Sequence, residues 1–181
     1  MNFKSKLVSV FGAGIIALSM VGGVAANNQV DVNVEVIKGG SGTLTYSLSA
    51  GTFSTATTSL TNTATSEGTL TLNVLDERFN FEGWTITMSA TEFTSPGKQS
   101  FGPEALQVST DGTVQPVRGD AKGVTASGAT MSTQGTPVMK AERGTGSGEY
   151  QMVYKGKVTV PANTQAGTYT TTITVNGTSA P

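Results

Sequence analysis

The chain has 181 residues, 11 of them basic and 12 acidic, with a formal net charge of −1 and with neither cysteine nor histidine. The missing cysteines exclude a disulfide framework, a thiolate nucleophile and a sulfur-ligated metal, and the missing histidines remove the commonest general base. Because the chain carries no excess of basic residues, nucleic acid and anionic membrane surfaces are poor candidates for its partner.

The first expected element is a secretory signal peptide over residues 1–26. It has a short basic start, an apolar run from Leu7 to Val21 and small residues ending at Ala26, so we expect the mature chain to begin at Asn27. A retained membrane anchor is the competing interpretation. The apolar run is short for a bilayer span and is interrupted by glycines, which favours cleavage, after which no membrane contact is expected.

After the predicted leader, apolar and polar residues alternate with a period of two, which indicates strands with one apolar face. The middle of the chain, residues 94–147, is richer in proline and glycine, and we expect shorter strands there. Pro161 ends a long alternating segment because proline cannot donate to a strand ladder. The expected strands are 30–37, 44–48, 70–74, 84–90, 106–108, 114–117, 124–131, 138–141, 150–160 and 169–175.

These strands predict an all-β fold. No window of the mature region repeats its apolar residues every 3.6 positions, as an amphipathic helix would. Many short strands rich in threonine and valine favour a Greek-key β-sandwich of two antiparallel sheets. We expect a single domain over residues 27–181.

Two segments resemble a known family. In the first, Trp84 is followed two positions later by Ile86, and in the second the spaced residues are Tyr169, Ile173, Thr174 and Pro181. They resemble the motifs Trp-x-Leu and Tyr-x-x-x-Leu-Thr-Trp-x-Leu-x-x-x-Pro of the WxL domain, found in Gram-positive cell-surface proteins. The chain departs from the second motif at Val175 and Gly177, where the family has tryptophan and leucine.

The resemblance implies a secreted protein that attaches non-covalently to the bacterial cell wall, with peptidoglycan or an associated glycan as partner. It implies these wall-binding candidates: Trp84, Ile86, Tyr169, Ile173, Thr174 and Pro181. We expect no enzyme, cofactor or metal site. A carboxylate-based glycosidase would need an aromatic-lined cleft, and only 7% of the residues are aromatic.

The alternative is a structural subunit of an extracellular filament or surface coat, in which the strand at 30–37 completes a neighbour's sheet. The missing second tryptophan favours this alternative, because the wall-binding surface could be altered. A third possibility is a module that binds other exported surface proteins, and the sequence does not separate it from wall attachment.

Two features have competing interpretations. Trp84 could stack on a sugar ring, but it shares a strand face with Ile86 and Met88, which favours core packing. The charged group of Asp76, Glu77, Arg78 and Glu82 could hold calcium through its carboxylates. A turn held by a carboxylate–guanidinium pair fits one arginine among three acids better.

Overall fold

The computed structural model describes residues 7–11, 14–21, 31–36, 42–110 and 112–179, and its contacts divide the chain into unit 1, Met1–Gly42, and unit 2, Thr43–Pro181. Unit 1 contains β1 (Leu7–Phe11), β2 (Gly14–Val21) and β3 (Asp31–Val36), paired antiparallel in that order. The strand predicted over 30–37 is therefore present as β3. Cleavage of the leader stays a prediction, and it would remove β2, the strand that β3 pairs with.

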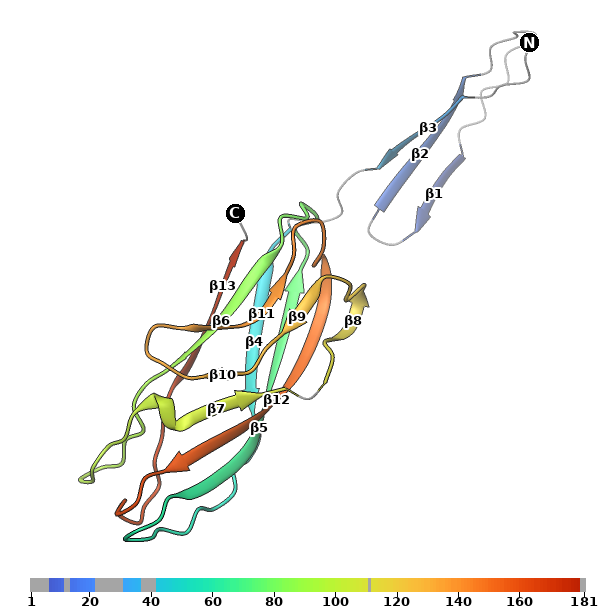
Figure 1. Cartoon of the computed structure of the whole chain (residues 1–181). Coiled ribbons are helices and arrows are strands. Elements are labelled where there is room, and N and C mark those ends of the chain that lie inside the picture. The colour runs from blue at the N-terminus through green and yellow to red at the C-terminus, as the bar shows by residue number, and fades with distance from the viewer. Residues whose placement is uncertain (1–6, 12–13, 22–30, 37–41, 111, 180–181) are drawn as a thin grey trace. The chain divides into compact units, whose positions relative to one another are not determined.

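Unit 2 consists of two antiparallel sheets, which confirms the all-β prediction (Figure 1). The first sheet has the order β10 (Ala129–Thr130), β7 (Leu106–Ser109), β12 (Gly148–Val160), β5 (Ala64–Asp76) and β4 (Leu44–Ala50), with β8 (Gln115–Gly119) also paired to β12. The second has the order β13 (Ile173–Ser179), β6 (Trp84–Ala90), β11 (Thr136–Ala141) and β9 (Val124–Ala126). The Greek-key connections stay a prediction.

Helical structure is limited, in the part of the chain that the structure describes, to the 3-10 turn η1 (Pro103–Ala105). No helix among these residues is long and apolar enough to cross a membrane.

The longest pairing joins β5 and β12 over 13 residues, from Asp76 opposite Gly148 to Ala64 opposite Val160. Strand β5 begins earlier than predicted because the threonine-rich residues before Leu70 continue the ladder, as β-branched residues favour. Its alternate side chains enter the core, whose largest fully buried members are Trp84, Tyr150, Tyr154, Leu70, Leu72, Ile86, Met88, Leu106, Met131, Met139, Val74 and Val138. Burial of this apolar surface is the main force holding the two sheets together.

Two further predicted strands differ from the structure. The strand predicted over 124–131 is two strands in different sheets, β9 and β10, and the chain changes sheet through Gly128. A Cβ on Gly128 would lie 2.9 Å from the carbonyl oxygen of Val108, so glycine allows the close approach. The last strand begins at Ile173 instead of Tyr169, because the residues before it bond to the connection after β6: Thr170 N–H donates to the Thr94 carbonyl at 2.9 Å.

Candidate functional site

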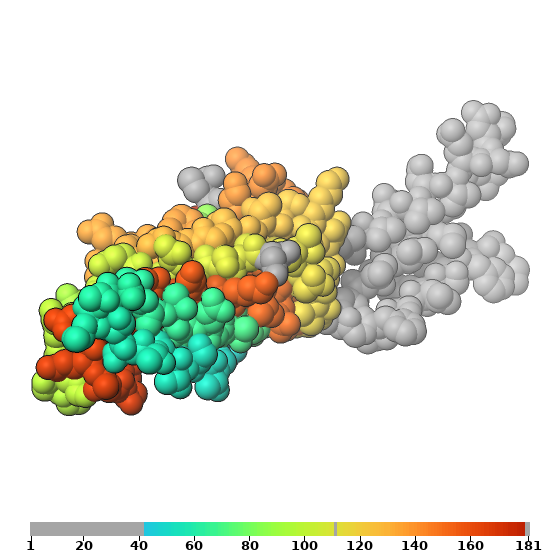
Figure 2. All heavy atoms as spheres, turned by 60° about the horizontal axis from the view of Figure 1, so that its bottom comes forward, coloured from blue at the N-terminus to red at the C-terminus, as the bar shows by residue number. Residues whose placement is uncertain are grey.

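A groove with a volume of about 870 Å³ opens at one end of unit 2. Three connections that are distant in the sequence surround it: residues 50–58 after β4, the segment between Phe93 and Phe101 after β6, and residues 164–171 between β12 and β13. Figure 2 shows these teal, yellow-green and red segments gathered at the same end. Apolar residues of the strands, including Leu70, Leu106 and Val158, also line the groove.

Three aromatic rings form a continuous apolar wall of the groove. Phe93 and Phe101 stack with ring centroids 4.8 Å apart and an interplanar angle of 11°, and Tyr169 lies 5.2 Å from Phe101. Backbone hydrogen bonds pair Phe93 with Phe101, and the Tyr169 hydroxyl donates to the Gln165 carbonyl at 3.0 Å. The rings are therefore held in place by neighbouring backbone.

A fourth ring, that of Phe53, lies over two glycines that face each other on adjacent strands, Gly68 of β5 and Gly156 of β12. A Cβ on Gly68 would come within 2.6 Å of the ring, and one on Gly156 within 2.7 Å. Both positions must lack a side chain for the ring to lie there. Phe53 was not predicted as a site residue, because it stands in a Ser/Thr-rich segment without periodicity. The facing glycines were the signal that could have indicated it.

The rest of the lining is polar but uncharged. It supplies hydroxyl and amide groups from Ser54, Thr55, Thr57, Thr58, Ser66, Thr164, Gln165, Thr168, Thr170 and Thr171. None of the described lining residues is charged. Lys98 lies beside Gly167, where its ammonium donates a hydrogen bond to the Ala166 carbonyl. Aromatic faces combined with neutral hydrogen-bonding groups suit a ligand with apolar faces and hydroxyl edges.

The structure brings together two of the predicted wall-binding residues, Tyr169 and Ile173, which both line the groove. Trp84 and Ile86 are 0% exposed, and the indole Nε1 of Trp84 donates to the Gly146 carbonyl at 3.0 Å. Core packing is thus the role that the structure supports for Trp84. The side chains of Trp84 and Ile86 have no surface to offer a ligand.

The remaining two candidates lie elsewhere. Thr174 is exposed on β13 and does not line the groove. Pro181 lies outside the described residues.

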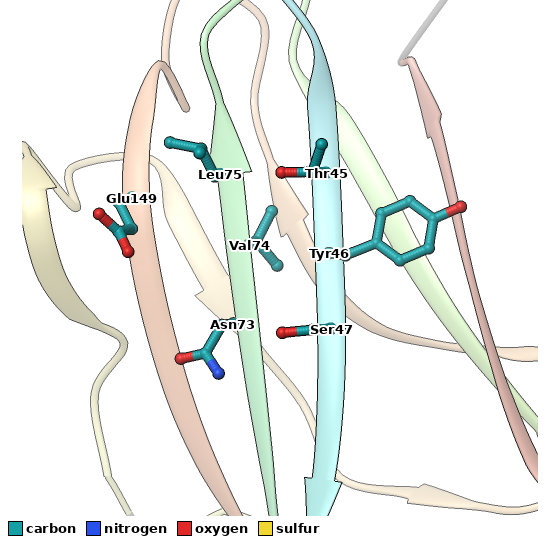
Figure 3. A pocket seen from close by; sticks show the side chains of 7 residues that line it. All are labelled: Thr45, Tyr46, Ser47, Asn73, Val74, Leu75 and Glu149. Atoms are coloured by element: carbon teal, nitrogen blue, oxygen red, sulfur yellow. The ribbon is translucent and has the colours of Figure 1, made fainter.

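A second, shallower hollow of about 280 Å³ lies over β4, β5 and β12 (Figure 3). Its lining mixes apolar residues such as Leu75 with polar ones such as Ser47 and Asn73, and the Asn73 side chain accepts a hydrogen bond from Gln151 at 3.0 Å. Glu149 at its margin is paired with Arg118 at 2.7 Å. This hollow offers no stacked rings and carries a charge that a ligand would have to desolvate, so the groove is the stronger candidate.

The charged turn after β5 is held by an ion pair, as predicted. The Asp76 carboxylate is 1% exposed and accepts from the Arg78 Nε at 2.9 Å. Hydrogen bonds to the Asp76 carboxylate raise the pKa of the Arg78 guanidinium, which also donates to the Gly83 carbonyl at 3.1 Å. Glu82 bonds instead to Asn80. The described residues contain no group of three or more side chains that could ligate a metal.

Comparison with known protein families gives a match over most of the chain. The family described as WxL domain surface cell wall-binding matches residues 26–181, beginning next to the predicted start of the mature chain. No curated protein and no solved structure matches the chain.

Proposed function

Since the chain belongs to the WxL family of surface cell wall-binding domains, we propose that it attaches non-covalently to a wall glycan through the groove of unit 2. Its location is the cell wall or cell surface. The signal peptide over residues 1–26 exports the chain, and the mature protein begins at Asn27. The ligand is a sugar strand such as that of peptidoglycan.

The lining of the groove carries this proposal. Sugar rings present apolar C–H faces and hydroxyl edges, and the rings of Phe53, Phe101 and Tyr169 can contact the faces while threonine and serine hydroxyls bond the edges. Because no described lining residue is charged, the ligand segment in the groove is neutral.

The groove binds its ligand without cleaving it. Hydrolysis of a glycosidic bond ordinarily needs two carboxyl groups on either side of that bond, and the described lining has no aspartate or glutamate. The aromatic cleft that a glycosidase needs is thus present, but the acid and base are not part of it.

Co-sedimentation of the leaderless protein with purified cell walls tests this proposal. We expect Phe53→Ala and Tyr169→Ala to lower the bound fraction, while Phe79→Ala serves as the matched control because its exposed ring lies outside the groove. Circular dichroism confirms that each variant is folded. Wall binding that is absent in the unsubstituted protein, or unchanged in both groove variants, would contradict the proposal.

The same co-sedimentation with walls stripped of their secondary polymers shows which wall component the groove binds. If the groove holds the peptidoglycan sugar strand, stripping leaves binding intact. Loss of binding on stripping would assign the ligand to the secondary polymer.

A further inference from the structure

One side of the unit 2 sandwich, where β4 and β13 lie, is incompletely covered. In the described part of the chain β4 pairs with β5 alone and β13 with β6 alone, so each strand has one unpaired backbone edge. Leu48 of β4 is only half-buried, whereas Leu72 opposite it on β5 is 0% exposed. In the same way, Val175 of β13 is half-buried, whereas Met88 opposite it on β6 is fully buried.

A further strand at this side would bury apolar groups that are now partly exposed. The Tyr46 ring lies against Gly177 of β13, yet 37% of Tyr46 is exposed. An unpaired strand edge with half-buried apolar residues is a site for strand addition. The occupant must alternate apolar and polar residues with the period of β4.

Strand β3 has this alternation in the required phase. Antiparallel pairing that places Val36 opposite Leu44 also places Val34 opposite Tyr46 and Val32 opposite Leu48. Every valine then shares the inward face of β4, and the polar residues between them join Thr45, Ser47 and Ser49 on the outer face. A shift by one residue would turn all the valines outward.

The connection between the two strands favours pairing within one chain. Val36 ends β3 and Leu44 begins β4, and the residues between them include Gly39, Gly40 and Gly42. Closing so short and glycine-rich a connection costs little entropy compared with recruiting a second molecule at low concentration.

We propose that, after the leader has been removed, β3 adds to the free edge of β4 in its own chain and becomes the outermost strand of the first sheet. This inference rests on the export step of the proposed function and is independent of the wall ligand. Leader removal takes away β2, the present partner of β3. The family match over residues 26–181 spans β3 as well as unit 2.

A disulfide test needs no knowledge of the wall. The chain has no cysteine, so Asn33→Cys combined with Ser47→Cys in the leaderless protein creates a single possible pair. The proposed register places these residues opposite each other, within disulfide reach. We expect an intrachain disulfide under mild oxidation, detected by non-reducing electrophoresis and peptide mass. The control pair, Asn33→Cys with Thr178→Cys on exposed β13, should stay reduced.

An interchain disulfide between Asn33→Cys and Ser47→Cys would overturn the inference, since it would assign β3 to a second copy and support the filament alternative. Absence of any disulfide in this variant would overturn it as well. Wall binding does not enter either readout, so failure here leaves the groove proposal untouched.

Hydrogen exchange gives a second measurement. We expect some β4 amides to exchange at least about tenfold more slowly in the leaderless protein than in its Val34→Lys variant, because an inward lysine opposes strand addition. The control Asn33→Lys places its charge on the outer face and should keep the protection. Equal exchange in all three proteins would overturn the inference.

Discussion

The buried carboxylate of Asp76 receives three hydrogen bonds from Arg78: from the backbone N–H at 3.0 Å, from Nε at 2.9 Å and from Nη2 at 3.0 Å. The same guanidinium donates to the Gly83 carbonyl and to the Ser179 hydroxyl of the last strand. The pair therefore ties the end of β5 in the first sheet to β6 and β13 in the second.

Replacing Asp76 with alanine should destabilise the fold strongly. The change leaves the largely buried guanidinium of Arg78 without its counter-charge. The free energy of unfolding should therefore decrease by about 3–5 kcal/mol. Glu149→Ala, which removes the partly buried partner of the exposed Arg118, should cost about 0–1 kcal/mol. Urea denaturation measures both, and equal losses would show that the Asp76 pair is not a structural tie.

Gly156→Ala should weaken wall binding without touching the ligand. The added methyl group collides with Phe53 and displaces its ring from the groove, so we expect affinity for purified walls to fall about tenfold, or about 1.4 kcal/mol. Gly112→Ala is the matched control, because nothing lies within 4 Å of its Cβ. Sedimentation isotherms compare the two, and an unaffected Gly156→Ala would remove Phe53 from the binding surface.

Trp84→Phe should lower stability and leave binding intact. The change loses the hydrogen bond to the Gly146 carbonyl and leaves a cavity, together about 1–3 kcal/mol of unfolding free energy. Because the indole is fully buried, wall binding of the folded variant should match that of the unsubstituted protein. Denaturation and co-sedimentation of the same preparation test both statements. Lost binding in a folded variant would restore Trp84 as a contact residue.

Stability should decrease in alkaline solution because of two buried tyrosines. Burial raises the pKa of Tyr154 and, together with Asp76 and Asp120, that of Tyr150. Their protonated forms persist in the fold, whereas the unfolded chain loses both protons from about pH 10 upward. Stability is thus fully present below about pH 10 and falls above it.

The free energy of unfolding of the Tyr154→Phe variant should decrease less steeply with pH over this alkaline range. The difference in slope is up to about 1.4 kcal/mol per pH unit. The variant also loses the hydrogen bond to the Val138 carbonyl, so its stability near neutral pH should be about 1 kcal/mol lower. Urea unfolding at a series of pH values gives both quantities. Parallel pH profiles would mean that Tyr154 titrates alike in the folded and unfolded chains.

The turn before β6 holds two phenylalanines in the left-handed region, Phe79 at φ 52° and Phe81 at φ 53°. Both rings are about half exposed, so neither contributes much to the core. Phe79→Asn should raise the unfolding free energy by about 1 kcal/mol, since asparagine tolerates this backbone conformation better. Thermal unfolding measures the change, with Phe53→Asn as the contrasting variant that should destabilise.

The alternation of residues was sufficient to predict most strands, including β4, β6 and β12, because one buried face repeats every second residue. It could not show that β9 and β10 belong to different sheets. That change of sheet depends on which strand each segment meets, and no local pattern around Gly128 records it.

The groove was harder to predict for a related reason. Its rings come from three connections far apart in the sequence, and Phe53 stands where the chain has no periodicity. The motif resemblance led to Tyr169 and Ile173 in the groove, but also to Trp84 and Ile86 in the core. A motif records which residues recur together and does not distinguish packing from contact with a ligand.

The ends of the sandwich differ in a way that matters under mechanical load. The Thr43 carbonyl is bonded to Glu77, and Ser179 lies opposite Trp84, so both residues lie at the end of the strands farthest from the groove. If the groove is bound to the wall and a force is applied to the chain at Thr43 or Ser179, the force acts along the direction of the strands. A load at Thr43 would place the ladder of β4 with β5 in shear, and a load at Ser179 the ladder of β13 with β6, so that several hydrogen bonds must rupture together and cannot unzip one by one.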